Sequence, residues 1–221
     1  MSRPELVIFD CDGVLVDTEP LGNTTLGAAL RDAGVAIDDA TVATQFRGWS
    51  MTSVVDWIRA ERDVSLGARF LPDFQESLFR TLRHGVAAMP GADATLASLV
   101  QQRCVASSGE PEKMRLSLSL TGLLGWFGSQ LFSATQVKRG KPAPDLFLFA
   151  AASMGVRPEA CVVVEDSVAG VEAAHAAGMR VFGYAPEAER LHGQHCRLGA
   201  AGALPLHDLR ELPGRLATDD W

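Results

Sequence analysis

The sequence predicts an α/β protein with a Rossmann-like, doubly wound parallel sheet and a small all-helical insert after the first strand. Two observations lead to this prediction. Short, unbroken apolar runs alternate with helical patterns along most of the chain, as in βαβ units. One long stretch near the N-terminus interrupts this alternation with helical patterns alone. The length of 221 residues suits one core domain with a small insert.

Four segments have the pattern of strands buried on both faces of a parallel sheet. Each is rich in apolar, mostly β-forming residues, and three of them stop at polar or acidic residues. The expected strands are residues 6–9, 102–106, 160–164 and 179–184. Helical patterns over residues 92–100, 111–120, 145–154 and 169–177 lie between and around them.

The helical insert is expected at residues 18–87, and the core at residues 1–17 and 88–221. Apolar residues recur at helical spacing within 21–30, 54–58 and 70–82, and a Met-Pro-Gly turn follows at 89–91. An insert after the first strand emerges at the carboxyl ends of the strands, where open sheets bind ligands. We therefore expect a cap over an active site. The tail from residue 185 has no clear pattern.

Composition narrows the choice of partners and compartment. The net charge of −7 and the pI of about 5.2 argue against nucleic acid or an anionic membrane as a partner. Four cysteines without a C-x-x-C pair, Cys11, Cys104, Cys161 and Cys196, suggest free thiols. No apolar stretch is long enough for a signal peptide or a membrane span. We expect a cytoplasmic protein that is a monomer or a weak homodimer.

Asp10 and Asp12 follow the first expected strand and are the first candidate site. Residues two apart in extended chain share a face, so both carboxylates can converge on one point. Two adjacent carboxylates repel each other and favour a hard cation such as Mg²⁺ between them. A calcium loop does not fit, because Val14 has no side-chain oxygen for the fifth position. Taken alone, the pair fits a solvated Asp-Gly turn equally well.

Ser107 and Ser108 occupy the end of the second expected strand. A helix that Pro111 can start follows them, and hydroxyls with free N–H groups at a helix N-terminus bind phosphate well. A plain helix cap remains the alternative.

Two further strand and loop ends carry charged residues. Lys141 lies in a proline-flanked loop, where a cation can neutralise phosphate charge, although an exposed loop lysine is the simpler interpretation. Glu165 and Asp166 end the third expected strand, where acidic residues can also be ordinary caps. Together with Asp10 and Asp12, these residues supply the nucleophile, cation and metal anchor that phosphoryl transfer requires. Their joint occurrence favours an active site.

Four motifs in this order resemble those of the haloacid dehalogenase-like hydrolase superfamily. The segments are residues 8–19 (IFDCDGVLVDTE), 105–108 (VASS), 141–142 (KP) and 165–170 (EDSVAG). Their spacing and the helical insert are similar to the branch that holds β-phosphoglucomutase and many sugar-phosphate phosphatases. The resemblance covers nearly the whole chain.

The resemblance implies a role for each motif residue. Asp10 attacks phosphorus to form an aspartyl-phosphate, and Asp12 protonates the leaving alcohol and then deprotonates water. Mg²⁺ is bound by Asp10, the backbone carbonyl of Asp12 and Asp166, with Glu165 nearby or contributing through water. The residues that hold the phosphate are Ser107, Ser108 and Lys141.

The choice within the superfamily depends on a few positions. Dehalogenases lack the second aspartate of the first motif, so Asp12 argues against that activity. The mutase carries a cap histidine four residues after the threonine, where this chain has Gly22, and an arginine where it has Met51. We therefore expect a Mg²⁺-dependent phosphatase acting on a small sugar or hydroxy-acid phosphate. A mutase and a non-catalytic binding protein of the same fold remain the alternatives.

Three cap residues lie where caps of this family contact the substrate: Arg47, Trp49 and Ser50. Arg47 suits pairing with a carboxylate or a second phosphate, but also a solvated helix position. Trp49 suits packing within the cap as well as stacking on a sugar.

Overall fold

The computed structural model describes residues 3–46, 51–186 and 193–218. The chain forms two compact units. A core unit comprises Met1–Val16 with Ala88–Trp221, and a helical unit comprises Asp17–Ala87. The expectation that the insert covers the active site concerns the relative placement of the two units and stays a prediction.

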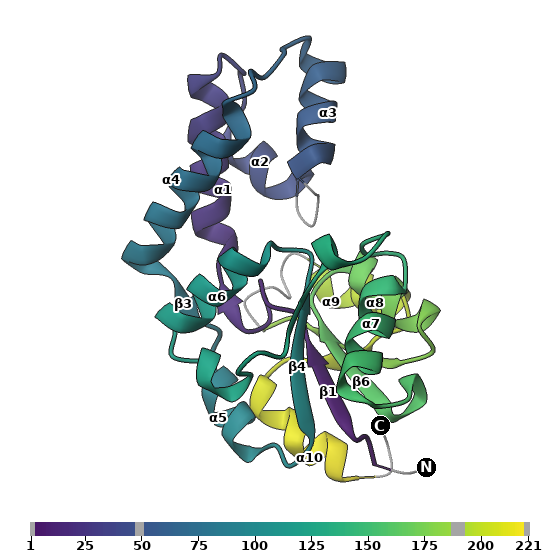
Figure 1. Ribbon diagram of the computed structural model, residues 1–221. Helices are drawn as coiled ribbons and strands as arrows, with labels where there is room; N and C mark the ends of the chain where they lie inside the picture. The colour runs from purple at the N-terminus through teal and green to yellow at the C-terminus, as the bar shows by residue number, and fades with distance from the viewer. Residues whose placement is uncertain (1–2, 47–50, 187–192, 219–221) are drawn as a thin grey trace. The chain divides into compact units, whose positions relative to one another are not determined.

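The core unit is built on a sheet of six parallel strands, which confirms the predicted fold class (Figure 1). In spatial order the strands are β5 (Leu131–Ser133), β4 (Gln102–Ser107), β1 (Leu6–Phe9), β6 (Cys161–Glu165), β7 (Arg180–Tyr184) and β8 (Leu204–Leu206). Phe9 at the end of β1 is in register with Val105 on one side and Val164 on the other. The residues that follow these three positions are Asp10, Ala106 and Glu165, so they emerge at one edge of the sheet.

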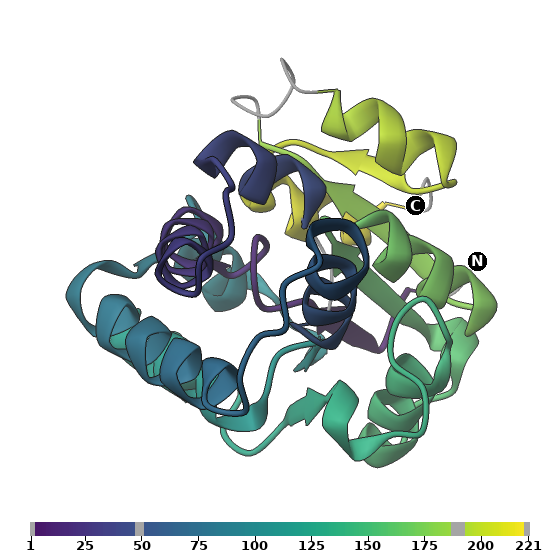
Figure 2. The ribbon, with the colours of Figure 1, turned by 90° about the horizontal axis from the view of Figure 1, so that it is seen from above.

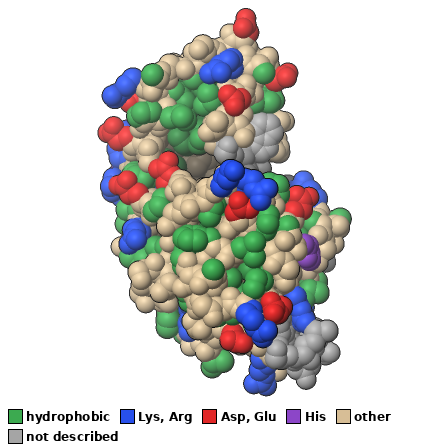
Figure 3. All heavy atoms as spheres, turned by 45° about the vertical axis from the view of Figure 1, so that its right-hand side comes forward, with side chains coloured by type: hydrophobic (Ala, Val, Ile, Leu, Met, Phe, Trp, Pro, Cys, Tyr) green, Lys and Arg blue, Asp and Glu red, His purple; other side chains and the backbone are tan. Residues whose placement is uncertain are grey.

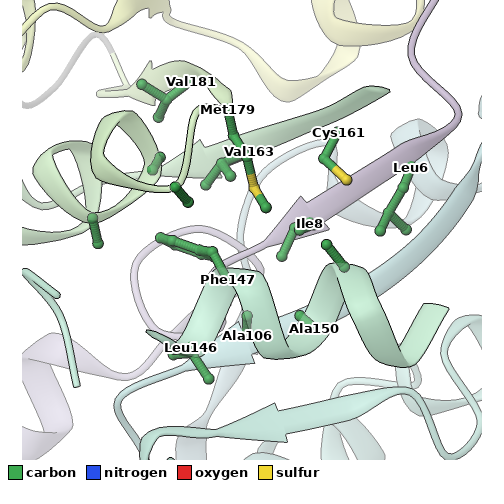
Figure 4. Close-up of a cluster of buried hydrophobic side chains, with 14 of the residues drawn as sticks. Leu6, Ile8, Ala106, Leu146, Phe147, Ala150, Cys161, Val163, Met179 and Val181 are labelled. Carbon is green, nitrogen blue, oxygen red and sulfur yellow. The ribbon is translucent and has the colours of Figure 1, made fainter. Parts of the chain in front are cut away.

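Helices cover both faces of this sheet, so the sheet is doubly wound (Figure 1). The core helices are α5 (Ala92–Ser98), α6 (Pro111–Leu120), α7 (Asp145–Met154), α8 (Val168–Ala176), α9 (Gln194–Ala200) and α10 (Leu212–Ala217). Side chains of α7, α8 and α9 pack with Ile8 and Val163 in a buried cluster on one face. Figure 4 shows Leu146, Phe147 and Ala150 of α7 gathered against this part of the sheet.

The opposite face of the sheet is covered by other residues of the core unit, among them Phe127 and helix α10. Phe9 packs edge-on against Phe127, with ring centroids 6.3 Å apart, and Arg215 of α10 lies over the ring of Phe182. Both phenylalanines of the strands are fully buried. Burying a side chain of this size stabilises the fold by roughly 1.5–3 kcal/mol, so the central strands form a rigid platform.

The described part of the helical unit contains four helices, α1 (Glu19–Asp32), α2 (Asp39–Gln45), α3 (Met51–Arg62) and α4 (Phe70–Gly85). α1 contacts both α2 and α4 (Figures 1 and 2). In α4 the buried residues are Phe74, Leu78 and Leu82, which follow the helical spacing expected from the sequence. Between the helices, Phe46 and Trp57 pack edge to face at 5.3 Å.

Several elements differ from the sequence-based expectation. The three-residue strands β5 and β8 were not expected, because so few residues leave no readable pattern. Helix α2 was also missed, since Val42 is its one buried residue; the carboxylate of Asp38 caps it by accepting from the N–H of Thr41 at 2.6 Å. Helix α5 ends at Ser98, because Leu99 is extended. The tail contributes α9, β8 and α10 to the core unit.

The remaining elements are short. Strands β2 (Val16–Asp17) and β3 (Ala87–Ala88) form a separate two-stranded sheet. Within the described ranges, the 3₁₀ helices are Leu124–Trp126, Ala134–Gln136, Pro158–Ala160 and Leu209–Glu211. None of the helices in the described ranges is both long and apolar enough to cross a membrane. On the face seen in Figure 3, acidic and basic side chains are interspersed.

Candidate active site

The loop after β1 places Asp10 in a buried and rigid position. The backbone N–H of Asp10 donates to the carbonyl of Val164 at 2.9 Å, which extends the β1–β6 ladder by one residue. The loop then turns at Gly13, whose φ of 80° favours glycine. Its turn is closed by hydrogen bonds from the N–H groups of Leu15 and Val16 to the carbonyl of Cys11. Asp10 is 6% exposed, so its carboxylate faces the interior of the site.

Lys141 joins three strand ends through its ammonium group. Nζ lies 2.6 Å from Oδ1 of Asp10 and 2.5 Å from Oε1 of Glu165, and it donates to the carbonyl of Ala106 at 3.0 Å. The Lys141 side chain is 3% exposed. The structure therefore brings Asp10, Lys141 and Glu165 together, although 155 positions separate the first from the last.

Burial and charge perturb the ionisation of this cluster. Burial raises the pKa of Asp10 to about 7; Lys141 opposes that shift, and the carboxylates of Glu165 and Asp12 add to it. Burial by itself lowers the pKa of Lys141, but the charges of Asp10 and Glu165 outweigh it and raise that pKa above its ordinary value. Lys141 is thus a cation at neutral pH, and a further cation beside Asp10 would favour the ionised form of its carboxyl group.

Glu165 is held by the start of α8. Its Oε2 accepts from both the N–H and the hydroxyl of Ser167, each at 2.8 Å. A side chain at Gly170 would overlap the Glu165 carboxylate, so glycine leaves the space that Glu165 fills. With Oε1 on Lys141 and Oε2 on Ser167, Glu165 orients Lys141 toward Asp10. Direct ligation of a metal by Glu165 stays a prediction.

Asp166 lies against the loop after β1. A Cβ atom at Gly13 would overlap the carboxylate of Asp166, so the absence of a side chain there lets this carboxylate approach the loop that carries Asp10 and Asp12. The amide of Gln194 in α9 donates to the backbone carbonyl of Asp166. Sequence reasoning missed Gln194, because nothing in the pattern of the tail connects it with residue 166.

The phosphate-binding candidates lie at the end of β4. Ser107 is 1% exposed, and its hydroxyl accepts from the N–H of Gly109 at 3.1 Å, whereas Ser108 is exposed. The hydroxyl of Ser133 in β5 donates to the carbonyl of Gly109 at 2.7 Å and so fixes this loop. Ser133 was also missed, since β5 itself was not expected.

A second lysine reaches the loop after β1. Lys113 of α6 places Nζ 2.9 Å from Oδ1 of Asp12. Burial lowers the pKa of Lys113, but the charge of Asp12 outweighs that effect and raises it. The sequence contains one indication of this contact. Lys113 lies in the first turn of a helix, where the helix dipole disfavours a lysine and favours acidic residues.

The donor set fits a hard divalent cation. No three His, Cys, Asp or Glu side chains of the described residues form a ready metal cluster. The metal site expected here uses two carboxylates and one backbone carbonyl, so it does not require a cluster of three such side chains. The charges agree with a cation: the carboxylates of Asp10, Asp12, Glu165 and Asp166 lie at this edge of the sheet, and the ammonium groups of Lys113 and Lys141 pair with three of them.

The three cap candidates lie outside the described residues: Arg47, Trp49 and Ser50. Of the two positions that distinguish a mutase, Gly22 belongs to α1 and Met51 is the first residue of α3. Their contribution to substrate contacts stays a prediction.

Comparisons with known proteins agree with the motifs. A family model described as haloacid dehalogenase-like hydrolase matches residues 4–178. A 6-phosphogluconate phosphatase of Escherichia coli K12 is 34% identical over 183 residues, which cover 82% of this chain and 83% of that protein. Hexitol phosphatase A of the same organism is 32% identical, over 79% of this chain and 80% of that protein.

A solved structure supports the same fold. The structure of a conserved haloacid dehalogenase-like protein from Agrobacterium tumefaciens superposes with a TM-score of 0.82 at 34% sequence identity, and the match covers 96% of this chain and 97% of the other.

Proposed function

The chain belongs to the haloacid dehalogenase-like hydrolases, in the branch of β-phosphoglucomutase-like proteins and sugar-phosphate phosphatases, and from this premise we propose that it is a Mg²⁺-dependent phosphatase of a small sugar or hydroxy-acid phosphate. The observation that carries the proposal is the buried Asp10 carboxylate, 2.6 Å from the fixed cation of Lys141 and two residues from a second carboxylate on Asp12.

In the first half of the reaction, Asp10 attacks phosphorus. The new bond joins an Asp10 carboxylate oxygen to phosphorus, the bond from phosphorus to the ester oxygen breaks, and Asp12 gives its proton to the departing alkoxide. In the second half, water attacks phosphorus, Asp12 takes a proton from that water, and the bond to Asp10 breaks. Phosphate leaves, and both aspartates return to their starting states.

The other residues of the site stabilise charge in this scheme. Lys141 and Ser107, with Ser108 beside it, hold the phosphoryl oxygens, and Lys141 also orients Asp10. Asp10, the Asp12 carbonyl and Asp166 are the residues that would hold Mg²⁺, with Glu165 acting through water or through Lys141. The ion supplies positive charge that offsets the phosphoryl oxygens in the transition state.

The substrate class is inferred from the relatives and from the cap. Similarity to proteins named as phosphatases of 6-phosphogluconate and hexitols supports a phosphorylated sugar acid or polyol. We assign contacts with its unreactive part to Arg47, Trp49 and Ser50. Gly22 and Met51 in place of the mutase's histidine and arginine favour water over a sugar hydroxyl as the second acceptor. The four free cysteines are consistent with action in the cytoplasm.

The test is phosphate release from a panel of phosphorylated metabolites, with Mg²⁺ or with excess chelator. The proposal expects Mg²⁺-dependent turnover that the Asp10→Asn variant loses. Undiminished activity in that variant, or full activity in chelator, would overturn it. A parallel assay of glucose 1-phosphate isomerisation distinguishes the mutase, which would produce isomer faster than free phosphate.

A further inference from the structure

We propose that Lys113 is a positioning residue that orients the Asp12 carboxylate for proton transfer to the leaving alcohol. The inference rests on the proposed function, in which Asp12 is the acid and base. Its basis is the ion pair between Nζ of Lys113 and Oδ1 of Asp12, at 2.9 Å.

The position of Lys113 is fixed by the helix that carries it. Helix α6 begins at Pro111, directly after the loop of Ser107, and buries Met114 and Leu118 in the core unit. Lys113 is therefore anchored by the residue that follows it in the helix. Because the backbone of α6 cannot shift without exposing these side chains, the lysine reaches toward Asp12 from a constant place.

Gly109 lies beside the two side chains where they meet. A Cβ atom built at Gly109 would lie 3.4 Å from Oδ2 of Asp12 and 3.9 Å from Cδ of Lys113. The ion pair thus passes directly over the loop that carries Ser107, whose Oγ would lie 3.4 Å from the same Cβ. Asp12, Lys113 and Ser107 share one small volume at the carboxyl ends of β1 and β4.

Stability does not account for this ion pair. The Lys113 and Asp12 side chains are 22% and 26% exposed, whereas Lys141 is 3% exposed. The desolvation of a largely buried pair offsets most of its Coulomb attraction, and the helix dipole opposes a lysine in the first turn. The net contribution of the pair to stability is therefore small. What the pair does provide is a fixed direction for the Asp12 carboxylate.

Orientation of a general acid has a specific kinetic signature. An alkyl phosphate releases a strongly basic alkoxide that needs a proton, whereas p-nitrophenyl phosphate releases a stable phenolate that needs almost none. Loss of Lys113 should therefore reduce kcat/KM on alkyl phosphates far more than on the aryl ester. A residue that merely bound the phosphoryl group, or merely supported the fold, would affect both esters alike.

The experiment compares kcat and KM for an alkyl and an aryl phosphate in wild-type, Lys113→Met and Asp12→Asn proteins, with Mg²⁺ present throughout. We expect Lys113→Met to lower the alkyl-to-aryl ratio of kcat/KM by at least about 10-fold, which is part of the ~10²–10⁴-fold that general acid–base catalysis contributes. The loss should fall on kcat rather than KM. Lys113→Arg should restore part of the ratio, since it keeps the charge. Lys138→Met, at an exposed loop lysine, is the matched control and should leave the ratio unchanged.

The outcomes separate this inference from the proposed function. Equal losses on both esters, or a loss in KM alone, would show that Lys113 binds substrate or supports the fold and would overturn the inference. An unchanged ratio in Asp12→Asn would instead refute the role of Asp12 itself. In the double variant, Lys113→Met should add little to Asp12→Asn; full additivity of the two losses also contradicts the inference. If Lys113→Met does not fold, Lys113→Gln answers the same question.

Discussion

Replacing Lys141 by Met removes the one ammonium group that Asp10 and Glu165 share. The three side chains are almost fully enclosed, with exposures of 3% for Lys141, 9% for Asp10 and 1% for Glu165. Methionine fills a similar volume but leaves two buried carboxylates facing each other. Breaking a buried ion pair in this way typically lowers the free energy of unfolding by about 3–5 kcal/mol.

The loss should depend on pH, and its sign follows from the carboxylates. Without Lys141, the pKa of Asp10, about 7 even with Lys141 in place, rises further above its unfolded value. A carboxyl group with a raised folded pKa contributes stability at low pH that is lost as pH rises through that pKa. We therefore expect the full loss of about 3–5 kcal/mol at pH 8 and a clearly smaller one at pH 5.

Equilibrium urea unfolding of wild-type and Lys141→Met proteins at both pH values, in chelator, measures this difference. Adding Glu165→Gln to Lys141→Met removes one unpaired carboxylate and should recover part of the loss. Arg139→Met, in a nearby ion pair that is exposed, is the matched control and should change stability little. A loss below about 1 kcal/mol at pH 8, the value of a surface pair, would refute the reasoning, as would equal losses at both pH values.

Two further predictions concern the packing around Glu165 and the competition between protons and Mg²⁺ at Asp10. Gly170→Ala should displace the Glu165 carboxylate and lower both kcat and the urea midpoint of unfolding. The control variant is Gly199→Ala on α9, where the added methyl group meets open space, and it should leave kcat unchanged. Equal behaviour of the two variants would contradict the close packing of Gly170 against Glu165. Because the pKa of Asp10 is about 7, protons compete with Mg²⁺ for the Asp10 carboxylate. The apparent affinity of the protein for Mg²⁺ should therefore weaken up to about tenfold per pH unit below 7. Isothermal titration calorimetry at pH 6 and 8 measures this shift, and an affinity independent of pH would contradict it.

Much of the fold was readable from the sequence because the central strands are buried on both faces. Strand β1 (Leu6–Phe9) and helices α6 (Pro111–Leu120) and α7 (Asp145–Met154) have the bounds that the patterns predicted. The edge strands β5 and β8 were not readable, since three residues show neither a run nor an alternation. Their places in the sheet depend on pairing with β4 and β7, which is long-range information.

The residues of the site likewise include some that could be predicted from the sequence and some that could not. Each expected residue of the core ends a strand, follows one or lies in a loop, and the carboxyl ends of parallel strands lie at one edge of the sheet. This explains why Asp10, Lys141 and Glu165 meet. Lys113 and Gln194 reach the site from helices, and a helix pattern does not say which turn faces a distant loop. The one local signal, a lysine in the first turn of α6, indicates an unusual partner without naming it.

The central claim is that Asp10 becomes phosphorylated during turnover. The direct measurement is peptide mass spectrometry after the Asp12→Ala variant reacts with p-nitrophenyl phosphate and is quenched in acid. Its aryl leaving group needs no acid, whereas hydrolysis of the intermediate lacks its base, so the phospho-enzyme should accumulate. Borohydride reduction should then convert the residue at position 10, and no other, to homoserine. An unmodified Asp10 in protein that has released nitrophenol, or a modification at another residue, would contradict the account.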